Sequence, residues 1–268
     1  MDTSEIRDRF QRDGYVGGVT VVDETQAAAH RSRLEWAEEQ IGPLHYRDKA
    51  HTFLQSPLEL ATHPNLLDAV EALIGPDILL YNALYIVKEP GSEGHIDWHQ
   101  DLTYWGLSEE AVDGQVSAWL ALSPATEESG CMAMVPGSHL AGAVAHATSD
   151  DDSNLLHHSQ RVSGVDTSAA KLCPLRPGEA SIHHGWTLHA SRPNRSDDRR
   201  IGLNIQFLAP NVRQTLHDHD TAMLVRGEDR YGHFGIDTGA TGDLEPDAME
   251  RQAAYQALMK GTYDDALS

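Results

Sequence analysis

The chain has 268 residues and a mass of 29.4 kDa, enough for one large hydrophobic core or two small domains. Its 20 basic and 41 acidic residues give a formal net charge of −21, which disfavours binding to nucleic acids or to anionic membrane surfaces. Residues 1–10 lack the features of a signal peptide, and no apolar run reaches the roughly 18–20 residues of a membrane span. We therefore expect one cytoplasmic domain over residues 1–268, without nucleic-acid or membrane partners; composition leaves its oligomeric state open.

Helical signals dominate the first 75 residues. An amphipathic stretch covers residues 4–11, and Asp23 is suited to cap a helix that continues to residue 40. Residues 65–74 carry apolar side chains at helical spacing, and both longer helices end at a Gly-Pro pair. These patterns predict three helices before the first strand.

From residue 78 the pattern changes to short runs of β-branched, aromatic and aliphatic residues separated by Gly, Pro, Asn and Asp. The predicted strands cover residues 78–87, 116–122, 132–135, 180–184, 187–190 and 201–208. Short strands with turn signals between them favour a sandwich or barrel over alternating βαβ units. Residues 140–167 are polar and predict a long surface loop of the kind that often forms a lid. After residue 210 the pattern is helical and polar again.

The densest chemical signal is the sequence WHQD at residues 98–101. If this segment is extended, His99 and Asp101 project from the same face, because side chains alternate along a strand. A second segment, HHGWTLH at residues 183–189, offers three histidines as a further ligand. Two imidazoles and one carboxylate on one side of a metal ion suit non-haem Fe(II) and oxygen chemistry. On spacing alone, ordinary hydrogen-bonded or exposed histidines explain the pattern equally well.

Arg199 and Arg200 directly precede the apolar run at residues 201–208. An arginine at the start of a buried strand needs an anionic partner, because a guanidinium stays charged and is costly to bury alone. A dicarboxylate co-substrate bound to a metal through one end would supply that partner through the other. A surface pair with Asp197 or Asp198 is the alternative, and it suits Arg199 better than an inward-facing Arg200.

Four blocks, taken in order, resemble the phytanoyl-CoA dioxygenase family of Fe(II)/2-oxoglutarate oxygenases. They are WHQD at residues 98–101, AWLAL…GCMAMVPGSH at 118–139, HHGWTLHASRPNRS at 183–196 and RRIGLNIQF at 199–207. The similarity runs from about residue 47 to residue 225, which we take as the core of the single domain. It implies a mainly β fold with flanking helices, a double-stranded β-helix of the jelly-roll or cupin-like kind, in agreement with the strand pattern.

The resemblance implies roles for individual residues by their position in these blocks. His99, Asp101 and His189 would bind iron, since His189 is the histidine followed by the family's distal-ligand pattern. Arg200 would hold the far carboxylate of 2-oxoglutarate, with the hydroxyl of Ser191 as a second donor. The remaining residues expected around the co-substrate are Trp119, Leu84, Asn82 and Lys49, with Lys88 as a further candidate.

The implied reaction is oxidation of an unactivated C–H bond by O2, coupled to decarboxylation of 2-oxoglutarate to succinate and carbon dioxide. Related halogenases have a small residue in place of the carboxylate ligand, so Asp101 favours hydroxylation, or another C–H oxidation such as desaturation, over halogenation. Two other classes would also use the metal ligands. One is a cupin-type isomerase or hydrolase with another metal, which leaves Arg200 without a purpose, and the other is a non-catalytic ligand-binding member of the fold.

A small molecule is the expected substrate. Candidate contacts flank the metal motif and the distal ligand: Tyr104, Trp105, His184, Trp186 and Arg192. The net charge of −21 argues against a large acyl-CoA ester, whose phosphates need basic partners. The segments LTYWGL at residues 102–107 and LVRG at 224–227 resemble bacterial members that act on small polar molecules. The sequence thus favours a hydroxylase of bacterial natural-product, amino-acid or phosphonate metabolism.

Overall fold

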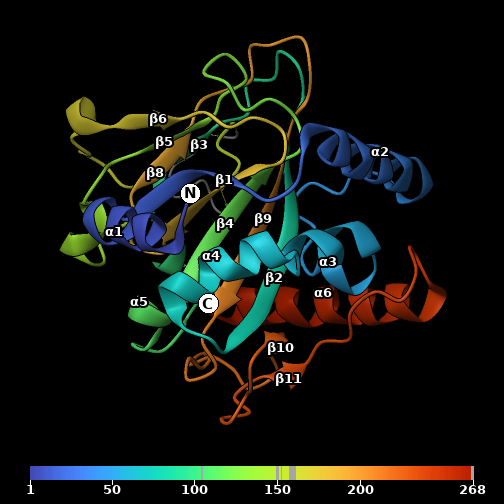
Figure 1. The fold of residues 1–268 in the computed structure, drawn as a ribbon. Helices are drawn as coiled ribbons and strands as arrows, with labels where there is room; N and C mark the ends of the chain where they lie inside the picture. Colours follow the sequence, from blue (N-terminus) through green and yellow to red (C-terminus); the bar gives the residue numbers. More distant parts are fainter. Residues whose placement is uncertain (104, 149–150, 152, 157–160, 267–268) are drawn as a thin grey trace.

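Two β-sheets pack against each other in the computed structural model of the protein, which describes residues 1–103, 105–148, 151, 153–156 and 161–266 (Figure 1). The larger sheet has the strand order β1-β7-β4-β9-β2-β10-β11, and the smaller has the order β3-β8-β5-β6. The strands are β1 (Tyr15–Thr20), β2 (Ile78–Lys88), β3 (Ile96–His99), β4 (Gln115–Ala121), β5 (Met132–Met134), β6 (Lys171–Cys173), β7 (Glu179–His184), β8 (His189–Ser191), β9 (Arg200–Leu208), β10 (Thr221–Arg226) and β11 (Gly235–Ile236).

The helices lie mostly before the first long strand and at the end of the chain. The α-helices are α1 (Thr3–Asp13), α2 (Glu24–Ile41), α3 (Gln55–Ala61), α4 (Pro64–Ile74), α5 (Ala111–Gly114) and α6 (Pro246–Ala266). Short 3-10 helices are η1 (Ala50–Thr52), η2 (Asp101–Thr103), η3 (Ser138–Ala141) and η5 (Thr167–Ala169). The predicted helices over 4–11, up to 40 and over 65–74 are confirmed to within two residues at each end.

Capping explains where the first helices begin and end. The carboxylate of Asp23 accepts a hydrogen bond from the backbone N–H of Gln26, and the backbone N–H of Asp23 donates to the Gln26 side chain. This reciprocal capping box starts α2 at the expected residue. Helix α1 ends at Gly14, whose φ of +80° is a left-handed conformation that glycine adopts without a steric penalty.

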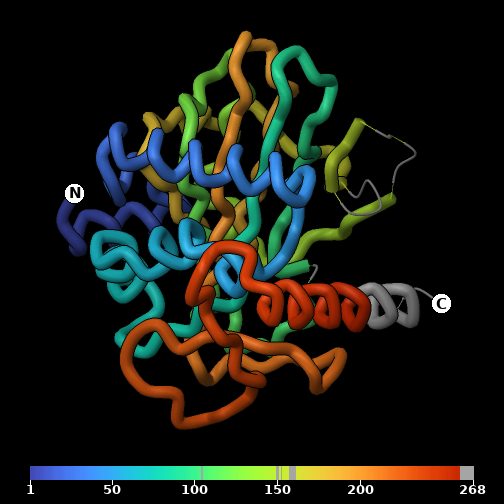
Figure 2. Tube along the Cα trace, turned by 90° about the vertical axis from the view of Figure 1, so that its right-hand side faces the viewer, coloured from blue at the N-terminus to red at the C-terminus, as the bar shows by residue number. Residues whose placement is uncertain are grey.

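The larger sheet separates two apolar layers. On one face, residues such as Tyr85 and Phe207 pack with Leu34 of α2 and Leu66 of α4 into the main core. On the other face, Leu84 and Trp119 meet Ile96 and Met132 of the smaller sheet in a second cluster. Figure 2 shows α2, in blue, and α6, in red, on the side of the molecule that faces the viewer. The larger sheet and its helices therefore separate the space between the two sheets from solvent on that side of the molecule.

Three predictions of secondary structure were wrong or incomplete. Residues 15–20 form the edge strand β1 beside β7 instead of continuing the helical region, because adjacent glycines and β-branched residues disfavour a helix there. Residues 221–226, in the stretch expected to be helical, form β10 and pair with β2. The strand predicted over 187–190 begins only at His189.

The predicted loop at 140–167 lies partly outside the described residues. Among the described residues, no helix is long and apolar enough to cross a membrane.

Candidate metal centre

Three side chains with metal-binding atoms meet between the two sheets. His99 ends β3, Asp101 begins η2 and His189 begins β8, and their ligand atoms all lie within 4.8 Å of one another. The Oδ1 atom of Asp101 lies 3.4 Å from Nε2 of His99 and 3.6 Å from Nε2 of His189. His99 and His189 are paired across β3 and β8, which brings their ring centroids to 4.0 Å. Asp101 thus reaches the cluster from a 3-10 turn and not, as the spacing argument assumed, from the strand.

Backbone carbonyls orient both imidazoles of this cluster. Nδ1 of His99 lies 2.9 Å from the carbonyl oxygen of Asp97, and Nδ1 of His189 lies 3.0 Å from that of Thr187. A carbonyl only accepts hydrogen bonds, so each Nδ1 carries the proton and each Nε2 keeps its lone pair. Both lone pairs are therefore available to a metal ion beside Asp101.

The second oxygen of Asp101 is held by the larger sheet. Oδ2 accepts a 2.6 Å hydrogen bond from the hydroxyl of Ser117 on β4 and lies 3.1 Å from Nε2 of His183 on β7. With Oδ2 engaged in this way, Oδ1 is the atom that faces the two imidazoles. His183, one of three histidines that spacing alone could not separate, supports the carboxylate and lies outside the ligand cluster.

The protonation states suit a metal ion. Burial, with the neighbouring His99 and His183, holds the pKa of His189 well below its usual range, so this imidazole is neutral. Burial opposes ionisation of Asp101, but the surrounding imidazoles, His189 first and then His183, hold the pKa of this carboxyl well below its usual range. A neutral imidazole and an ionised carboxylate are the forms that coordinate metals.

Gln100, the remaining polar residue of the WHQD motif, faces away from the cluster. It is fully buried, and its amide nitrogen donates 2.8 Å hydrogen bonds to the carbonyls of Gly142 and Trp186. Its amide oxygen accepts a 2.8 Å bond from the N–H of Val144. Gln100 therefore fastens two loops around the metal motif, a role that the sequence pattern did not indicate.

Arg200 is a buried guanidinium without a carboxylate partner among the described residues. It is 1% exposed, stacks 4.1 Å from the ring centroid of Trp119, and its Nε and Nη1 atoms have no hydrogen-bond partner. Burial lowers its pKa to about 10, so it remains charged at neutral pH. Gly202 makes this stack possible, because a Cβ there would lie 1.9 Å from Cζ2 of Trp119. Ser117 and Trp119 occupy the same face of β4, so the guanidinium and the metal cluster open on the same interior.

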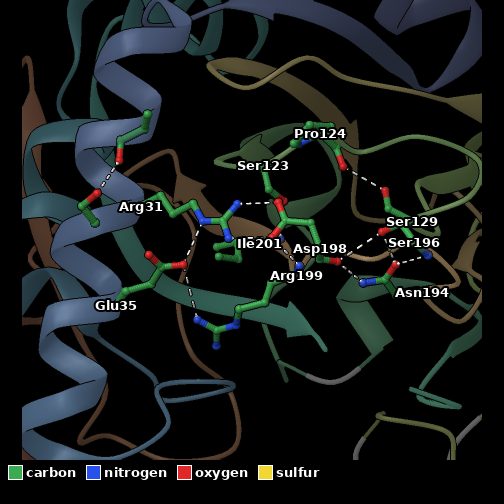
Figure 3. Close-up of polar contacts among 12 residues, drawn as sticks. Arg31, Glu35, Ser123, Pro124, Ser129, Asn194, Ser196, Asp198, Arg199 and Ile201 are labelled. Carbon is green, nitrogen blue, oxygen red and sulfur yellow. Dashed lines mark hydrogen bonds and ion pairs between the residues drawn. The ribbon is translucent and has the colours of Figure 1, made fainter. Parts of the chain in front are cut away.

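The turn that leads into β9 is rigidly anchored, as Figure 3 shows. Asp198 receives a bidentate pair from Arg31 of α2, at 2.6 and 2.7 Å, and the backbone N–H of Ile201 donates to the hydroxyl of Ser123. Arg199 points outward to Glu38, at 2.8 Å, and to other surface carboxylates. Arg199 thus pairs at the surface, though with glutamates and not with the expected Asp197 or Asp198, and Arg200 is directed inward.

Two other residues expected at the co-substrate share neighbours with Arg200. Leu84 packs with Trp119, on which Arg200 stacks. The buried hydroxyl of Ser191 lies 2.7 Å from Nζ of Lys88, which is paired with Arg200 across β2 and β9. Sequence reasoning missed Tyr46, which stands in a left-handed conformation at φ +56°. The residue is 37% exposed as a whole. Burial of its phenol raises the pKa of that group, the charge of Arg200 lowers it and the charge of Asp101 raises it. A strained non-glycine residue beside a charged pocket is typical of functional sites.

Asn82 and Lys49 have other partners. Asn82 accepts a 2.7 Å bond from the backbone N–H of Lys49 and donates a 2.7 Å bond to Asp48. The ammonium of Lys49 donates to the carbonyls of Tyr81 and Thr221 and to the carboxylate of Asp237. The expectation that Lys49 faces the co-substrate is therefore corrected, because all three of its N–H groups tie other parts of the chain together.

The candidate substrate contacts divide into two groups. Trp105 and Trp186 pack against one apolar cluster that includes Leu102, next to Asp101. His184 lies on the opposite face of β7 from His183 and packs on Phe10 and His139 of the helical side, so its expected substrate contact is corrected. The side chain of Arg192 is 79% exposed and faces Glu127 at 3.9 Å, away from the interior. Tyr104 lies outside the described residues.

Comparison with known proteins places these observations in a family. A model of the family described as phytanoyl-CoA dioxygenase (PhyH) matches residues 10–202. A probable alpha-ketoglutarate-dependent hypophosphite dioxygenase of Stutzerimonas stutzeri is 27% identical over 167 residues, 62% of this chain and 57% of that protein. Phytanoyl-CoA dioxygenase domain-containing protein 1 of Danio rerio is 33% identical over 130 residues, 48% of this chain and 43% of that protein. The chain thus spans about half the length of the curated relatives it matches.

Solved structures match over nearly the whole chain. The apo form of ThoJ, described as a non-heme monooxygenase, has a TM-score of 0.86 at 27% identity and covers 98% of both chains. CytC3 with Fe(II) and alpha-ketoglutarate has a TM-score of 0.67 at 24% identity, over 92% of this chain and 97% of that chain. At the latter identity the likeness concerns the fold alone, and it confirms the predicted jelly-roll class.

Proposed function

Because the chain belongs to the phytanoyl-CoA dioxygenase family, we propose that it is a non-haem Fe(II)- and 2-oxoglutarate-dependent dioxygenase that oxidises a small molecule. One observation carries the proposal. A cluster of two imidazoles and one carboxylate opens on the same interior as a buried guanidinium that has no carboxylate partner among the described residues. A metal enzyme of another class would need the cluster but would leave a costly buried charge unexplained.

The donor set suits Fe(II). Nε2 of His99, Nε2 of His189 and Oδ1 of Asp101 would hold the ion from one side, as in the facial triads of non-haem iron oxygenases. Ser117 and His183 would keep the carboxylate in place by occupying its other oxygen. The positions opposite these three ligands would remain open for a chelating co-substrate and for O2.

The pocket around Arg200 suits the far carboxylate of 2-oxoglutarate. A guanidinium with free N–H groups binds a carboxylate through charge-assisted, often bidentate hydrogen bonds. Trp119 would hold the guanidinium in plane, and Ser191 would add a hydroxyl donor. Leu84 would line the apolar middle of the co-substrate, whose two methylene groups need no polar partner.

With iron and 2-oxoglutarate bound, the site would use O2 to oxidise a C–H bond while the keto acid is converted to succinate and carbon dioxide. The protein's contribution is binding and orientation, and no general base is required. Asp101 occupies the position that a halide would need, which favours hydroxylation over halogenation. Trp105 and Trp186, packed near Leu102, would shield the reacting carbon from water.

The proposed substrate class rests on the charge of the protein and on a relative. The proposed substrate is a small molecule of bacterial natural-product, amino-acid or phosphonate metabolism. The net charge of −21 and the pairing of the exposed Arg192 with Glu127 disfavour a substrate that carries a polyphosphate. The probable hypophosphite dioxygenase, whose name gives a small substrate, is consistent with this proposal.

An anaerobic titration tests the proposal. Adding Fe(II) and then 2-oxoglutarate to metal-free protein should produce a weak visible charge-transfer band from the keto acid chelated to iron. His189→Ala should abolish this band, whereas His184→Ala, the same substitution at a histidine that packs on Phe10 and His139, should preserve it. Absence of any band in the unmodified protein, or its loss only in a His183→Ala variant, would contradict the proposed ligand set.

A further inference from the structure

Lys88, at the end of β2, is a buried amine to which the proposed reaction has so far assigned no role. It is 1% exposed, and its Nζ donates hydrogen bonds to the hydroxyl of Ser191 at 2.7 Å, to the carbonyl of Ser191 at 3.1 Å and to the carbonyl of Arg192 at 2.6 Å. The carbonyl of Lys88 itself accepts a 3.0 Å bond from the amide of Asn194. The side chain is therefore held at the end of β8, and the backbone of Lys88 is held by the loop that follows.

Lys88 also stands beside Arg200. The two residues are directly paired across β2 and β9, and both side chains are 1% exposed. Neither forms an ion pair with a carboxylate among the described residues. Two buried basic side chains in one place cannot both carry a charge cheaply, because the charges repel each other and are costly to desolvate, so an anion beside them would favour the charged form of both.

We propose that Lys88 is a positioning residue for the far carboxylate of 2-oxoglutarate, which turns the hydroxyl of Ser191 toward that carboxylate and adds a second positive charge behind Arg200. This inference rests on the proposed function, since it assigns a residue to the co-substrate of the same site. It also assigns the pocket a preference for keto acids with two carboxylates over those with one.

The direction of the hydrogen bonds explains how Lys88 acts. A protonated Lys88 has three N–H groups and no lone pair, so the hydroxyl of Ser191 can only accept from it. The hydroxyl proton of Ser191 is then free to donate to a carboxylate. A neutral Lys88 has two N–H groups, which match the two carbonyls, and one lone pair, which would accept the Ser191 proton. The carboxylate of the ligand therefore favours the protonated form.

Binding of the dianion should take up a proton in a defined pH range. The titratable or charged groups around Lys88 are Arg200 on β9, Cys131 before β5, His45 before η1, Arg192 after β8 and Glu89 after β2. Burial, and then Arg200, lowers the pKa of Lys88 to about 6 in the free pocket. A carboxylate beside it raises this pKa again, so above about pH 6 binding requires protonation. Affinity for 2-oxoglutarate should accordingly fall as the pH rises.

Calorimetry on Ni(II)-loaded protein measures the proton uptake on ligand binding without turnover. At pH 7.5, titrations in two buffers of different ionisation enthalpy give the number of protons taken up with each ligand. We expect uptake approaching one proton with 2-oxoglutarate and clearly less with 2-oxopentanoate, which has a methyl group in place of the far carboxylate. Equal uptake with both ligands would overturn the inference without any variant.

Substitution provides the second arm. Lys88→Met should weaken 2-oxoglutarate binding by about 10–100-fold, the range of a lost hydrogen bond to a charged group, and leave 2-oxopentanoate binding unchanged. Lys171→Met, the same change at an exposed position, is the matched control and should alter neither. If Lys88→Met binds 2-oxoglutarate as tightly as the unmodified protein, the role of Lys88 is wrong and the proposed function stands. If the unmodified protein binds no 2-oxoglutarate, the proposed function itself fails.

Discussion

The hydroxyl of Ser117, on the larger sheet, lies 2.6 Å from Oδ2 of Asp101, which belongs to the metal cluster of the smaller sheet. This contact fixes which carboxylate oxygen faces the imidazoles. Ser117, which lies outside the cluster of metal-binding side chains, thus helps to orient Asp101.

Ser117→Ala should therefore weaken metal binding without removing any ligand. Loss of such a supporting hydrogen bond typically lowers metal affinity by about 10–100-fold, since the carboxylate becomes free to rotate. Competition with a chromophoric chelator for Co(II) or Fe(II) measures the effect. Ser32→Ala, on the exposed face of α2, is the control and should bind metal normally. Unchanged affinity in Ser117→Ala would show that His183 alone orients Asp101.

Adjacent arginines with opposite surroundings offer a second test. Arg200→Lys should raise the KM for 2-oxoglutarate by about 10–100-fold, because an ammonium loses the planar fork and the stack on Trp119. Metal affinity should not change. Arg199→Lys, the same substitution one residue earlier, should leave the KM for 2-oxoglutarate unaltered, since that side chain pairs with surface carboxylates. Equal effects at both positions would place the co-substrate elsewhere.

Gly202 should not tolerate a side chain. Gly202→Ala would place a methyl group 1.9 Å from Cζ2 of Trp119, and overpacking of this kind costs about 1–3 kcal/mol in the free energy of unfolding. We also expect weaker 2-oxoglutarate binding, because Trp119 supports Arg200. Combining Gly202→Ala with Trp119→Phe, whose smaller ring lacks Cζ2, should be less harmful than the sum of the two changes. Strict additivity in urea unfolding would contradict the predicted clash.

A buried histidine makes stability depend on pH. Burial, and then His139, lowers the pKa of His184 to about 4 in the folded protein, against an ordinary value of 6.5. Between these values the unfolded chain binds a proton that the folded protein refuses, so stability falls as the pH drops from about 7 toward 4, by up to roughly 3 kcal/mol. His184→Asn retains an acceptor for the N–H of Trp186 but does not titrate. Urea unfolding at pH 7 and pH 5 should show a smaller difference for this variant.

The sequence was informative where chemistry is local. The spacing of His99 and Asp101 predicted two ligands, and the position of Arg200 at the head of an apolar strand predicted a buried cation in need of an anion. Spacing could not separate His183, His184 and His189, because their roles depend on strand faces and on where β8 begins. In the structure, His183 turns to Asp101 and His184 turns to the helices, as alternation along β7 requires.

Long-range contacts account for most of the remaining differences. Lys49 and Lys88 were both candidates for the co-substrate, and the choice depends on contacts more than 100 residues away in sequence, to Thr221 and Asp237 in one case and to Ser191 in the other. Strand β10 escaped prediction because half-exposed strands of mixed polarity lack a clear period. Tyr46 gave no signal in the sequence, because its left-handed backbone conformation is set by the surrounding fold.

The ligands and their supports belong to different halves of the barrel. His99 and His189 come from the smaller sheet, whereas Ser117 and His183, which grip Asp101, come from the larger one. A metal ion bound there would link the two sheets, and its binding free energy would add to the stability of the folded protein. Removal of the metal with a chelator should then loosen the packing between the two sheets. Amide hydrogen exchange along β3 and β8 should accelerate more than exchange in the helices.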